Sequence, residues 1–372
     1  DQATISRVNN FCRSQTPPIG FISCESWGVG GYAFVDFGPE FTCFDKTGEE
    51  TRSFIVSNIT QENPGVVTVH DEKRHTFQDG DFVAFKEVQG MEEINDTPPR
   101  PIKFLGPYSF SIEDTSGYSA YSREGIVEQV KVPEKLSFKS WEESCLDPVV
   151  NEPLPVPDLG KFGRSEQLHI LFRAIREFQT QKGELPALRS DEHAEEVLRI
   201  ANEINADAKA KGGLCVEELE TDVLRAVTKH ARAQITPIAS FWGGVVAQEI
   251  VKFTGKYHPL YQWLHLEFTE IINPAGDHSP QNSRYDEQIA IIGNELQNTF
   301  LSMKTFLVGA GALGCEFLKL FALMGVACGD GQVVVTDDDS IEVSNLNRQF
   351  LFRKDMVGKS KINARAHTVV VC

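Results

Sequence analysis

The stretch that decides the fold reads TFLVGAGALG at residues 305–314. Its first four residues form an apolar strand, and the rest is a Gly-x-Gly-x-x-Gly turn that opens a helix. The predicted buried side of this helix is Phe317, Leu318, Phe321 and Met324. The first glycine permits a tight turn, the second lets a phosphate approach the backbone, and the third lets the helix pack against the strand. This order predicts an α/β domain with a phosphate site at the positive end of the helix. A purely structural glycine turn is the alternative interpretation.

A second apolar strand, residues 333–336, ends in three consecutive aspartates, residues 337–339. An acidic side chain at such a strand end can accept hydrogen bonds from both hydroxyls of a ribose, so Asp337 is the predicted ribose ligand. Asp339 can cap the following turn. Asp337 lies 28 positions after Gly309, more than the roughly 20 typical of dinucleotide-binding proteins. The fingerprint alone therefore does not choose between NAD, FAD and an adenylate.

The polar segment SNLNRQFLF follows at residues 344–352, and Lys359 and Lys361 come soon after it. A dinucleotide pyrophosphate is largely satisfied by a helix N-terminus. A triphosphate that loses pyrophosphate builds up more charge, which fixed cations stabilise. Arg348 and Lys361 can supply these cations, so the pattern favours ATP chemistry over a dinucleotide-dependent oxidoreductase.

The middle of the chain changes character twice. Residues 41–150 contain short β-rich runs divided by turns such as Asn63-Pro64-Gly65, which predicts a small β-barrel or sandwich. Helical apolar stripes follow, and Gly183 and Gly212 mark breaks between helices. With a further helix near 237–254, these stripes predict a four-helix bundle. The predicted strands of residues 41–150 are 54–56, 66–69, 82–85, 102–105, 108–112 and 126–130, and further strand-like runs lie at 21–24, 33–37 and 263–268. The stripes are Leu168, Leu171, Ile175, Phe178; Ala194, Val197, Ala201, Ile204; and Val216, Leu219, Val223, Val227.

The composition excludes several classes of protein. The 372 residues include 36 basic and 53 acidic ones, for a formal net charge of −17. Nucleic acid is an unsuitable partner for such a chain, because neutralising phosphates needs clustered Lys and Arg. No apolar run reaches the roughly 18 residues that would predict a membrane span. The eight cysteines include no Cys-x-x-Cys pair, which argues against a zinc site.

The glycine turn, Thr336-Asp337, the SNLNRQFLF segment and the lysine at 361, taken together, resemble the adenylation domain of eukaryotic ubiquitin-activating enzymes. Enzymes that activate other ubiquitin-like proteins share the nucleotide motif and match the middle of the chain less well. The resemblance extends over nearly the whole chain, through PGVV at 64–67, GDF at 80–82, VQGM at 88–91, LGPY at 105–108, QLH at 167–169, AQE at 247–249 and RYDEQ at 284–288.

The resemblance implies a fragment with a mixed, multidomain α/β architecture, in which a partial Rossmann-like nucleotide-binding domain comes last. The expected parts are the end of an inactive adenylation domain (1–40), a β-rich first catalytic-cysteine half-domain (41–155), a four-helix bundle (156–235), a return into the inactive adenylation domain (236–275) and the start of the active adenylation domain (276–372).

The resemblance also implies the roles of single residues. Arg348 and Lys361 are the expected catalytic residues of this chain, Arg284 has a mainly structural role, and Cys315 is a small buried residue. ATP and Mg²⁺ are the expected cofactors, with Asp339 as a possible contributor to a metal site. The expected nucleotide-binding residues are Gly309, Gly311, Ala312, Gly314, Asp337, Asn345, Arg348 and Lys361.

The implied activity is ATP-dependent adenylation of the ubiquitin C-terminus, followed by thioester formation and transfer to a ubiquitin-conjugating enzyme, in the cytoplasm and nucleus. The thioester cysteine is expected outside these 372 residues, and the fragment alone is expected to be inactive, because catalysis needs cations, metal and nucleophile together. An activating enzyme for another ubiquitin-like protein and a non-catalytic ubiquitin-binding scaffold are the alternatives.

Overall fold

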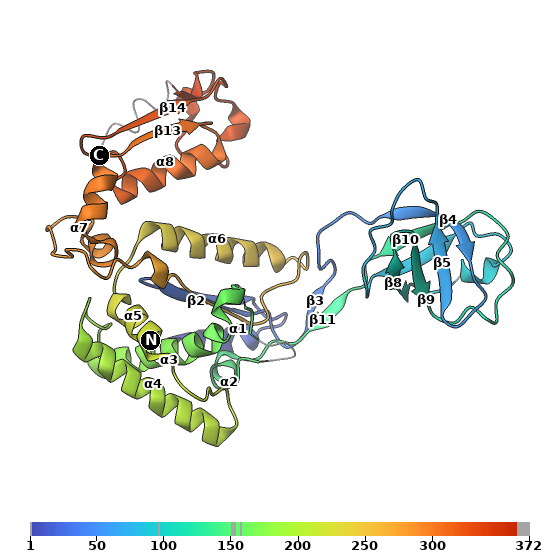
Figure 1. Ribbon diagram of the computed structural model, residues 1–372, viewed down its shortest axis with the longest axis horizontal. Coiled ribbons are helices and arrows are strands. Elements are labelled where there is room, and N and C mark those ends of the chain that lie inside the picture. Colours follow the sequence, from blue (N-terminus) through green and yellow to red (C-terminus); the bar gives the residue numbers. More distant parts are fainter. Residues whose placement is uncertain (1, 96, 150–153, 157, 363–372) are drawn as a thin grey trace. The chain divides into compact units, whose positions relative to one another are not determined.

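The computed structural model describes residues 2–95, 97–149, 154–156 and 158–362 (Figure 1). The chain divides into two compact units. The first unit consists of residues 1–38, 138–250 and 260–372, and the second of residues 39–137 and 251–259. Within the described ranges, no helix is both long and apolar enough to cross a membrane.

A three-stranded antiparallel sheet lies at the centre of the first unit, in the order β1-β2-β12. The middle strand β2 is buried along its whole length, because helices cover both of its faces. A Cβ on Gly30 would lie 3.2 Å from Phe172 of α3, and one on Gly31 would lie 2.4 Å from the Trp242 indole of α6. The strands predicted near 21–24, 33–37 and 263–268 are confirmed as β1 (Phe21–Trp27), β2 (Gly30–Asp36) and β12 (Trp263–Glu267).

Helix α1 (Gln2–Arg13), which the sequence analysis did not predict, is joined to this sheet by a buried polar network. Asn9 donates to Asp36 Oδ2 at 2.7 Å, and Arg13 Nη1 donates to both oxygens of that carboxylate at 2.8 and 2.9 Å. The Asp36 side chain is fully buried. Its charge is compensated by Arg13, so burial does not leave an unpaired ion.

The helices of the first unit follow the predicted apolar stripes, and α3 and α4 lie side by side (Figure 1). Gly183 and Gly212 end α3 and α4 in the left-handed conformation, with φ of 78° and 71°, which a residue with a side chain adopts at a cost. The helices are α2 (Trp141–Leu146), α3 (Arg164–Lys182), α4 (Asp191–Lys211), α5 (Thr221–His230) and α6 (Thr236–Lys252).

The helix predicted from the stripe at 216–227 begins later than its pattern indicated. Helix α5 starts at Thr221, so Val216 and Leu219 are buried or partly buried before the helix instead of within it. The backbone of Val216 both donates to and accepts from the side-chain amide of Asn205 on α4, each at 2.9 Å. Because this side chain satisfies the backbone polar groups, the segment has no need of helical hydrogen bonds.

The second unit contains a seven-stranded sheet in the order β7-β6-β10-β4-β5-β9-β8. Its two outer strands, β7 and β8, are successive parts of one stretch that pairs with β6 at one end and with β9 at the other, so the sheet closes on itself. All six predicted strands of this region are confirmed. The strands are β3 (Phe41–Cys43), β4 (Ser53–Ile59), β5 (Gly65–Val69), β6 (Phe82–Lys86), β7 (Arg100–Pro101), β8 (Lys103–Gly106), β9 (Ser109–Ile112), β10 (Ile126–Val130) and β11 (Glu134–Leu136), where β3 and β11 pair separately.

The last part of the chain has the predicted strand, turn, helix, strand order. The two strands are parallel, with Lys304 opposite Gln332 and Val308 opposite Thr336. The prediction for the buried side of α8 was partly wrong: Leu318 is buried, but Phe317 is 46% exposed. The elements are α7 (Asp286–Ser302), β13 (Lys304–Val308), α8 (Ala312–Met324) and β14 (Gln332–Thr336), followed by the 3₁₀ turns η4 (Val343–Asn345) and η5 (Lys354–Met356).

The reason for the Phe317 error is that apolar residues lie on more than one side of α8. The side of the helix that is buried in this structure carries Gly314, Cys315 and Leu318. An apolar residue in a helix does not by itself indicate which of several apolar faces packs on the sheet. The mixed architecture of α/β, β-rich and helical parts is nevertheless confirmed.

Candidate functional site

The glycine turn between β13 and α8 has the shape that its sequence predicts. Gly309 has φ of 94°, in the left-handed region that favours glycine. Its N–H donates to the carbonyl of Thr336 at 2.8 Å, which ties the turn to the end of β14. A Cβ on Gly309 or Gly311 would meet no described atom within 4 Å. Among the described residues, none fills the space beside the turn, as a phosphate at the N-terminus of α8 requires.

The Asp337 carboxylate lies directly against this turn. Its side chain is only 7% exposed. One carboxylate oxygen accepts a hydrogen bond from the backbone N–H of Ala310 in the turn, and the other accepts one from the N–H of Asp339 at 2.9 Å. Asp337 is thus held at the carboxyl end of β14, the end at which α/β sheets bind their ligands. Its assignment as the ribose ligand fits this position and stays a prediction.

Lys361 reaches the same place from 24 residues further along the chain. Its side chain is 7% exposed, and its Nζ lies 2.5 Å from Asp339 Oδ2 and 3.8 Å from Asp337 Oδ1. The backbone N–H of Lys361 also donates to the Asp339 carbonyl at 3.1 Å. The structure therefore brings together the glycine turn, Asp337 and Lys361, which were predicted to share one site.

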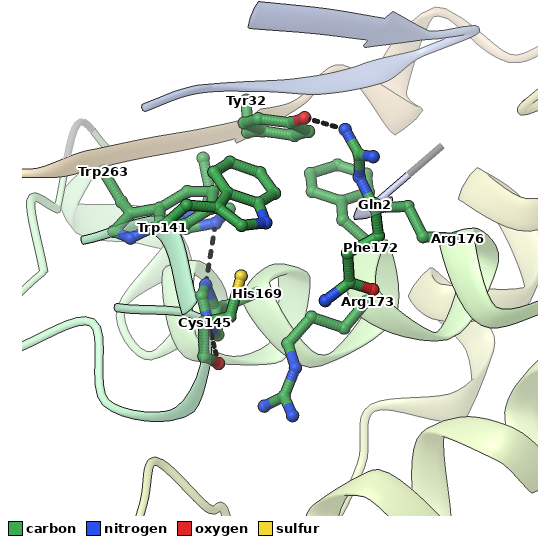
Figure 2. A pocket seen from close by; sticks show the side chains of 10 residues that line it. Gln2, Tyr32, Trp141, Cys145, His169, Phe172, Arg173, Arg176 and Trp263 are labelled. Atoms are coloured by element: carbon green, nitrogen blue, oxygen red, sulfur yellow. Dashed lines mark hydrogen bonds between the residues drawn. The ribbon is translucent and has the colours of Figure 1, made fainter. Parts of the chain in front are cut away.

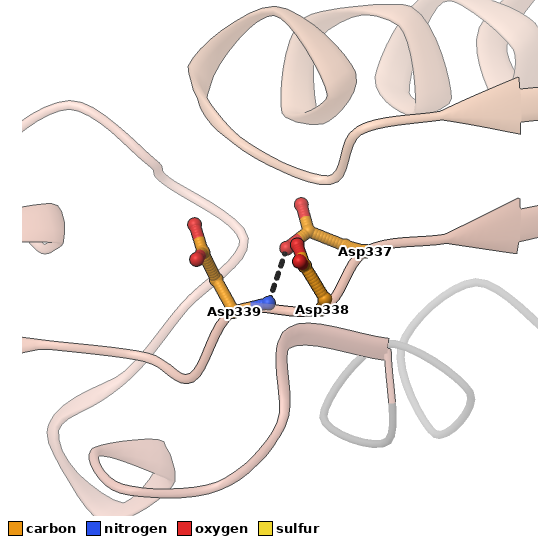
Figure 3. Close-up of side chains that lie close together, drawn as sticks. All are labelled: Asp337, Asp338 and Asp339. Atoms are coloured by element: carbon orange, nitrogen blue, oxygen red, sulfur yellow. Dashed lines mark hydrogen bonds between the residues drawn. The ribbon is translucent and has the colours of Figure 1, made fainter.

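The three aspartates offer oxygen atoms that all lie within 4.8 Å of one another (Figure 3). Oxygen ligands of this kind suit Mg²⁺. The Asp339 carboxylate, however, is paired with the Lys361 ammonium, and a cation in contact with a carboxylate competes with a metal for it. The cluster does not by itself make a metal site, and Mg²⁺ remains a prediction.

Asn345 and Arg348 follow the aspartates in η4 and just beyond it. Asn345 is buried, and its Oδ1 accepts from the N–H of Glu342 at 3.0 Å. Arg348 is exposed, and its Nη1 donates to the carbonyl of Ser344 at 2.7 Å and to Asn347 Oδ1 at 3.1 Å. Both side chains therefore stabilise their own turn, and their predicted contacts with phosphate are still untested.

Sequence comparisons find matches in the β-rich, the helical and the nucleotide-binding α/β parts of the chain. Curated relatives include ubiquitin-activating enzyme E1 2 of Arabidopsis thaliana, 44% identical over 368 residues and 97% of this chain, and ubiquitin-like modifier-activating enzyme 1 of Homo sapiens, 44% identical over 371 residues and 98% of this chain. The matching family models are the ubiquitin-activating enzyme E1 FCCH domain at residues 62–131, the ubiquitin-activating enzyme E1 four-helix bundle at 132–205 and the ThiF family at 285–371.

The chain belongs to the ubiquitin-activating enzyme E1 family. It spans about a third of the length of the two relatives, 34% in each case. The bundle match begins at residue 132, whereas the sequence analysis expected the bundle from residue 156. A solved structure of E. coli MccB covers 38% of this E1 chain at 21% identity with a TM-score of 0.22.

A cavity inside the first unit of the E1 chain is too small for a cofactor. Its volume is about 10 Å³, room for about one water molecule. His169 Nδ1 lies 3.2 Å from His265 Nε2, and His169 Nε2 lies 2.9 Å from the carbonyl of Cys145 (Figure 2). The Trp263 ring packs against both histidines, edge-on to His169 and stacked on His265. This is the interior of a packed domain and not a binding site.

Burial decides the charge of these two histidines. Desolvation lowers the pKa of His169 to about 3 and that of His265 well below its ordinary value, because the charged form loses its hydration. Both imidazoles are therefore neutral at pH 7. His265 Nδ1 has no hydrogen-bond partner among the described residues, which is consistent with a ring that packs as an apolar group.

The cysteines of the described residues differ in their access to solvent. Burial raises the pKa of Cys24 and Cys145 to about 12, which suppresses the thiolate that a nucleophile needs. Cys315, at the N-terminal end of α8, is fully buried, as the sequence analysis expected. Cys215 is exposed, but no electropositive partner of Cys215 is present among the described contacts.

Arg284 has contacts of a structural kind. Its Nη2 donates to the carbonyl of Ala322, in the last turn of α8, and to the hydroxyl of Tyr285, both at 2.8 Å. A cation that binds the free carbonyls of a helix end stabilises that helix. These contacts agree with the structural role that the sequence analysis gave to Arg284.

Sequence reasoning missed two contacts that hold Asp337 and Lys361 in place. It did not predict that Ala310 N–H binds Asp337, or that Asp339 binds Lys361. No local pattern signals either contact, because each joins residues more than 20 positions apart. The three adjacent aspartates were a visible signal of excess negative charge, which a lysine nearby would compensate.

Proposed function

We propose that the protein to which this chain belongs is an ATP-dependent ubiquitin-activating enzyme. One observation carries the proposal: a buried carboxylate, Asp337, and a buried ammonium, Lys361, lie together at the open glycine turn before α8. A carboxylate at this strand end suits ribose hydroxyls, and an ammonium beside the turn suits phosphate oxygens. The names of the relatives support the choice of ubiquitin as the protein substrate.

The proposed roles of the single residues are those expected from the sequence. Asp337 binds the ribose, and Arg348 and Lys361 stabilise negative charge on the phosphates during the reaction. Mg²⁺, when bound with ATP, would neutralise further phosphate charge. The residues of the glycine turn and η4 complete the site: Gly309, Gly311, Ala312, Gly314 and Asn345.

The proposed reaction joins the C-terminal carboxylate of ubiquitin to the α-phosphate of ATP and releases pyrophosphate. A cysteine thiolate then displaces AMP to form a thioester, from which a ubiquitin-conjugating enzyme takes ubiquitin. We place that cysteine outside residues 1–372. The raised pKa of Cys24 and Cys145 and the full burial of Cys315 support this placement.

Ubiquitin and ubiquitin-conjugating enzymes are the proposed partners, and the cytoplasm and nucleus the proposed location. The formal net charge of −17 supports a basic protein surface as partner and opposes nucleic acid. No membrane partner is proposed. Activation of another ubiquitin-like protein remains the second candidate, because one set of relatives is named for ubiquitin-like modifiers.

The decisive experiment is ATP–pyrophosphate exchange by the intact protein, with and without ubiquitin. We expect exchange that depends on ubiquitin and falls at least about 100-fold in Asp337→Ala and Arg348→Ala. Exchange that appears only with another ubiquitin-like protein would replace the substrate. Binding of ubiquitin without any nucleotide effect would instead favour a non-catalytic scaffold, and binding of NAD without a response to ATP would favour an oxidoreductase.

A further inference from the structure

The Lys361 ammonium is buried between two carboxylates, Asp337 and Asp339, that differ in their hydrogen bonds and in their distance from it. Its Nζ is 2.5 Å from Asp339 Oδ2 and 3.8 Å from Asp337 Oδ1, and its side chain is 7% exposed. A buried ammonium needs a close counter-charge, since it has lost most of its hydration. Asp339 supplies the shorter contact, because both oxygens of Asp337 already accept backbone hydrogen bonds from Ala310 and Asp339.

The backbone holds the two partners in register. The N–H of Lys361 donates to the Asp339 carbonyl at 3.1 Å, and that of Ile341 donates to the Lys359 carbonyl at 2.9 Å. Ser340 and Ser360 form an antiparallel bridge between these two contacts. The segments 339–341 and 358–361 thus form a short ladder, and the ion pair is part of a built structure instead of a chance contact between mobile side chains.

Asp339 differs from Asp337 in its exposure. The Asp339 side chain is 67% exposed and that of Asp337 only 7%. An exposed carboxylate is rehydrated at little cost when its partner leaves, since exposed ion pairs contribute little net free energy. Asp339 can therefore hold the ammonium at the turn and release it to a competing anion, whereas Asp337 stays fixed to the turn.

We propose that Asp339 is a positioning residue, which holds the Lys361 ammonium beside Asp337 so that it meets a nucleotide phosphate at the glycine turn. The positioning stands on the contacts above, and the identity of the ligand as ATP rests on the proposed function. This role replaces the metal-binding role considered for Asp339 from the sequence.

Three variants of the intact protein test the proposal. Asp339→Asn removes the charge at nearly constant shape, Asp339→Glu keeps the charge, and Asp355→Asn removes one exposed carboxylate of η5 as a control for net charge. The first readout is the rate at which an amine-selective reagent labels Lys361 without nucleotide, followed by mass spectrometry of its peptide. The second is the KM for ATP and the maximal rate in pyrophosphate exchange.

In Asp339→Asn we expect several-fold faster labelling of Lys361 and a KM for ATP about ten-fold higher, the size of one lost charged hydrogen bond. The maximal rate should change less than KM, because saturating ATP restores the position of the ammonium. Asp339→Glu should be close to wild type in both readouts, and so should Asp355→Asn. A general folding defect would lower the maximal rate and would not be rescued by glutamate.

The labelling rate of Lys361 tests the positioning role of Asp339, and the KM for ATP tests the link to the nucleotide phosphate. Unchanged labelling of Lys361 in Asp339→Asn would overturn the positioning role, whatever happens to exchange. Faster labelling with an unchanged KM for ATP would overturn the link to the nucleotide phosphate. A wild-type protein that neither binds nor uses ATP would overturn the proposed function, and labelling alone would then decide whether Asp339 positions Lys361.

Discussion

The buried histidine pair should make the first unit sensitive to mild acid. The perturbation is a change from pH 7 to pH 5. In the folded state the pKa of His169 is about 3, and in the unfolded chain it is near the ordinary value of about 6.5. Between these values the unfolded state binds a proton that the folded state does not, so the free energy of unfolding falls as the pH falls below about 6.5.

The size of this loss in the free energy of unfolding follows from the shift in the pKa of His169. At pH 5 the unfolded imidazole is protonated and the folded one is neutral, which lowers the free energy of unfolding by about 2 kcal/mol for His169. The pKa of His265 is lowered too, so His265 adds to this loss of stability in the same direction. This is a large fraction of the 5–15 kcal/mol that typically separates folded from unfolded domains.

Tryptophan fluorescence during urea unfolding is the appropriate assay. All 4 tryptophans, at positions 27, 141, 242 and 263, lie in the first unit and are buried, so the signal reports that unit alone. Carboxylates with lowered pKa, such as Asp45 and Glu143, are ionised throughout pH 5–7 and do not contribute to the change.

His169→Gln is the informative variant, because glutamine keeps a donor toward the Cys145 carbonyl and does not titrate. We expect it to be less stable at pH 7 and to show a smaller loss of stability than the wild type between pH 7 and pH 5. The exposed His70 of the second unit provides the matched control, and His70→Gln should leave the dependence unchanged. Equal urea midpoints of the wild type at pH 7 and pH 5, or an unaltered slope in His169→Gln, would refute the reasoning.

Three further predictions concern packing, charge and thiol access. Gly31→Ala should destabilise the first unit by about 1–3 kcal/mol in urea unfolding, because its Cβ would lie 2.4 Å from an indole of α6. Gly243→Ala, whose Cβ would meet no atom of the described neighbouring residues within 4 Å, should be neutral or slightly stabilising. Asp36→Asn should cost about 3 kcal/mol in the same assay by leaving a partly buried arginine without its counter-charge, and a change under about 0.5 kcal/mol would contradict that role. Among the described cysteines, exposed Cys215 should react first with a thiol reagent, and Cys315 only on unfolding; early labelling of Cys315 would show that α8 is not packed as described.

Features that depend on neighbours in the chain were predicted from the sequence. The turn at Gly309 follows from a backbone that only glycine adopts easily, and the ends of α3 and α4 at Gly183 and Gly212 follow from the same preference. The apolar spacing of α3 fits a helix with one buried face, and all four residues of its stripe are buried. Such signals lie within one or two turns of chain, so a single sequence displays them.

Features that join distant segments were decided only by the tertiary structure. The α5 stripe was extended too far, because the bond between Val216 and Asn205 is invisible in a periodic pattern. Closure of the barrel depends on one stretch, residues 100–106, that pairs at both of its ends. Neither the hydrophobic spacing nor the turn chemistry of those strands specifies which of them will be neighbours.

In the candidate site, too, the residue types could be predicted from the sequence, but the contacts between them could not. The residue types at the glycine turn, the strand end and the later lysine were recognisable, because each chemistry requires a particular side chain. Which carboxylate holds Lys361, and that Asp337 bonds to the turn itself, were not recognisable. Charges attract at short range irrespective of their separation along the chain, so the sequence alone determined which charged groups are available, and only the folded backbone decided which of them meet.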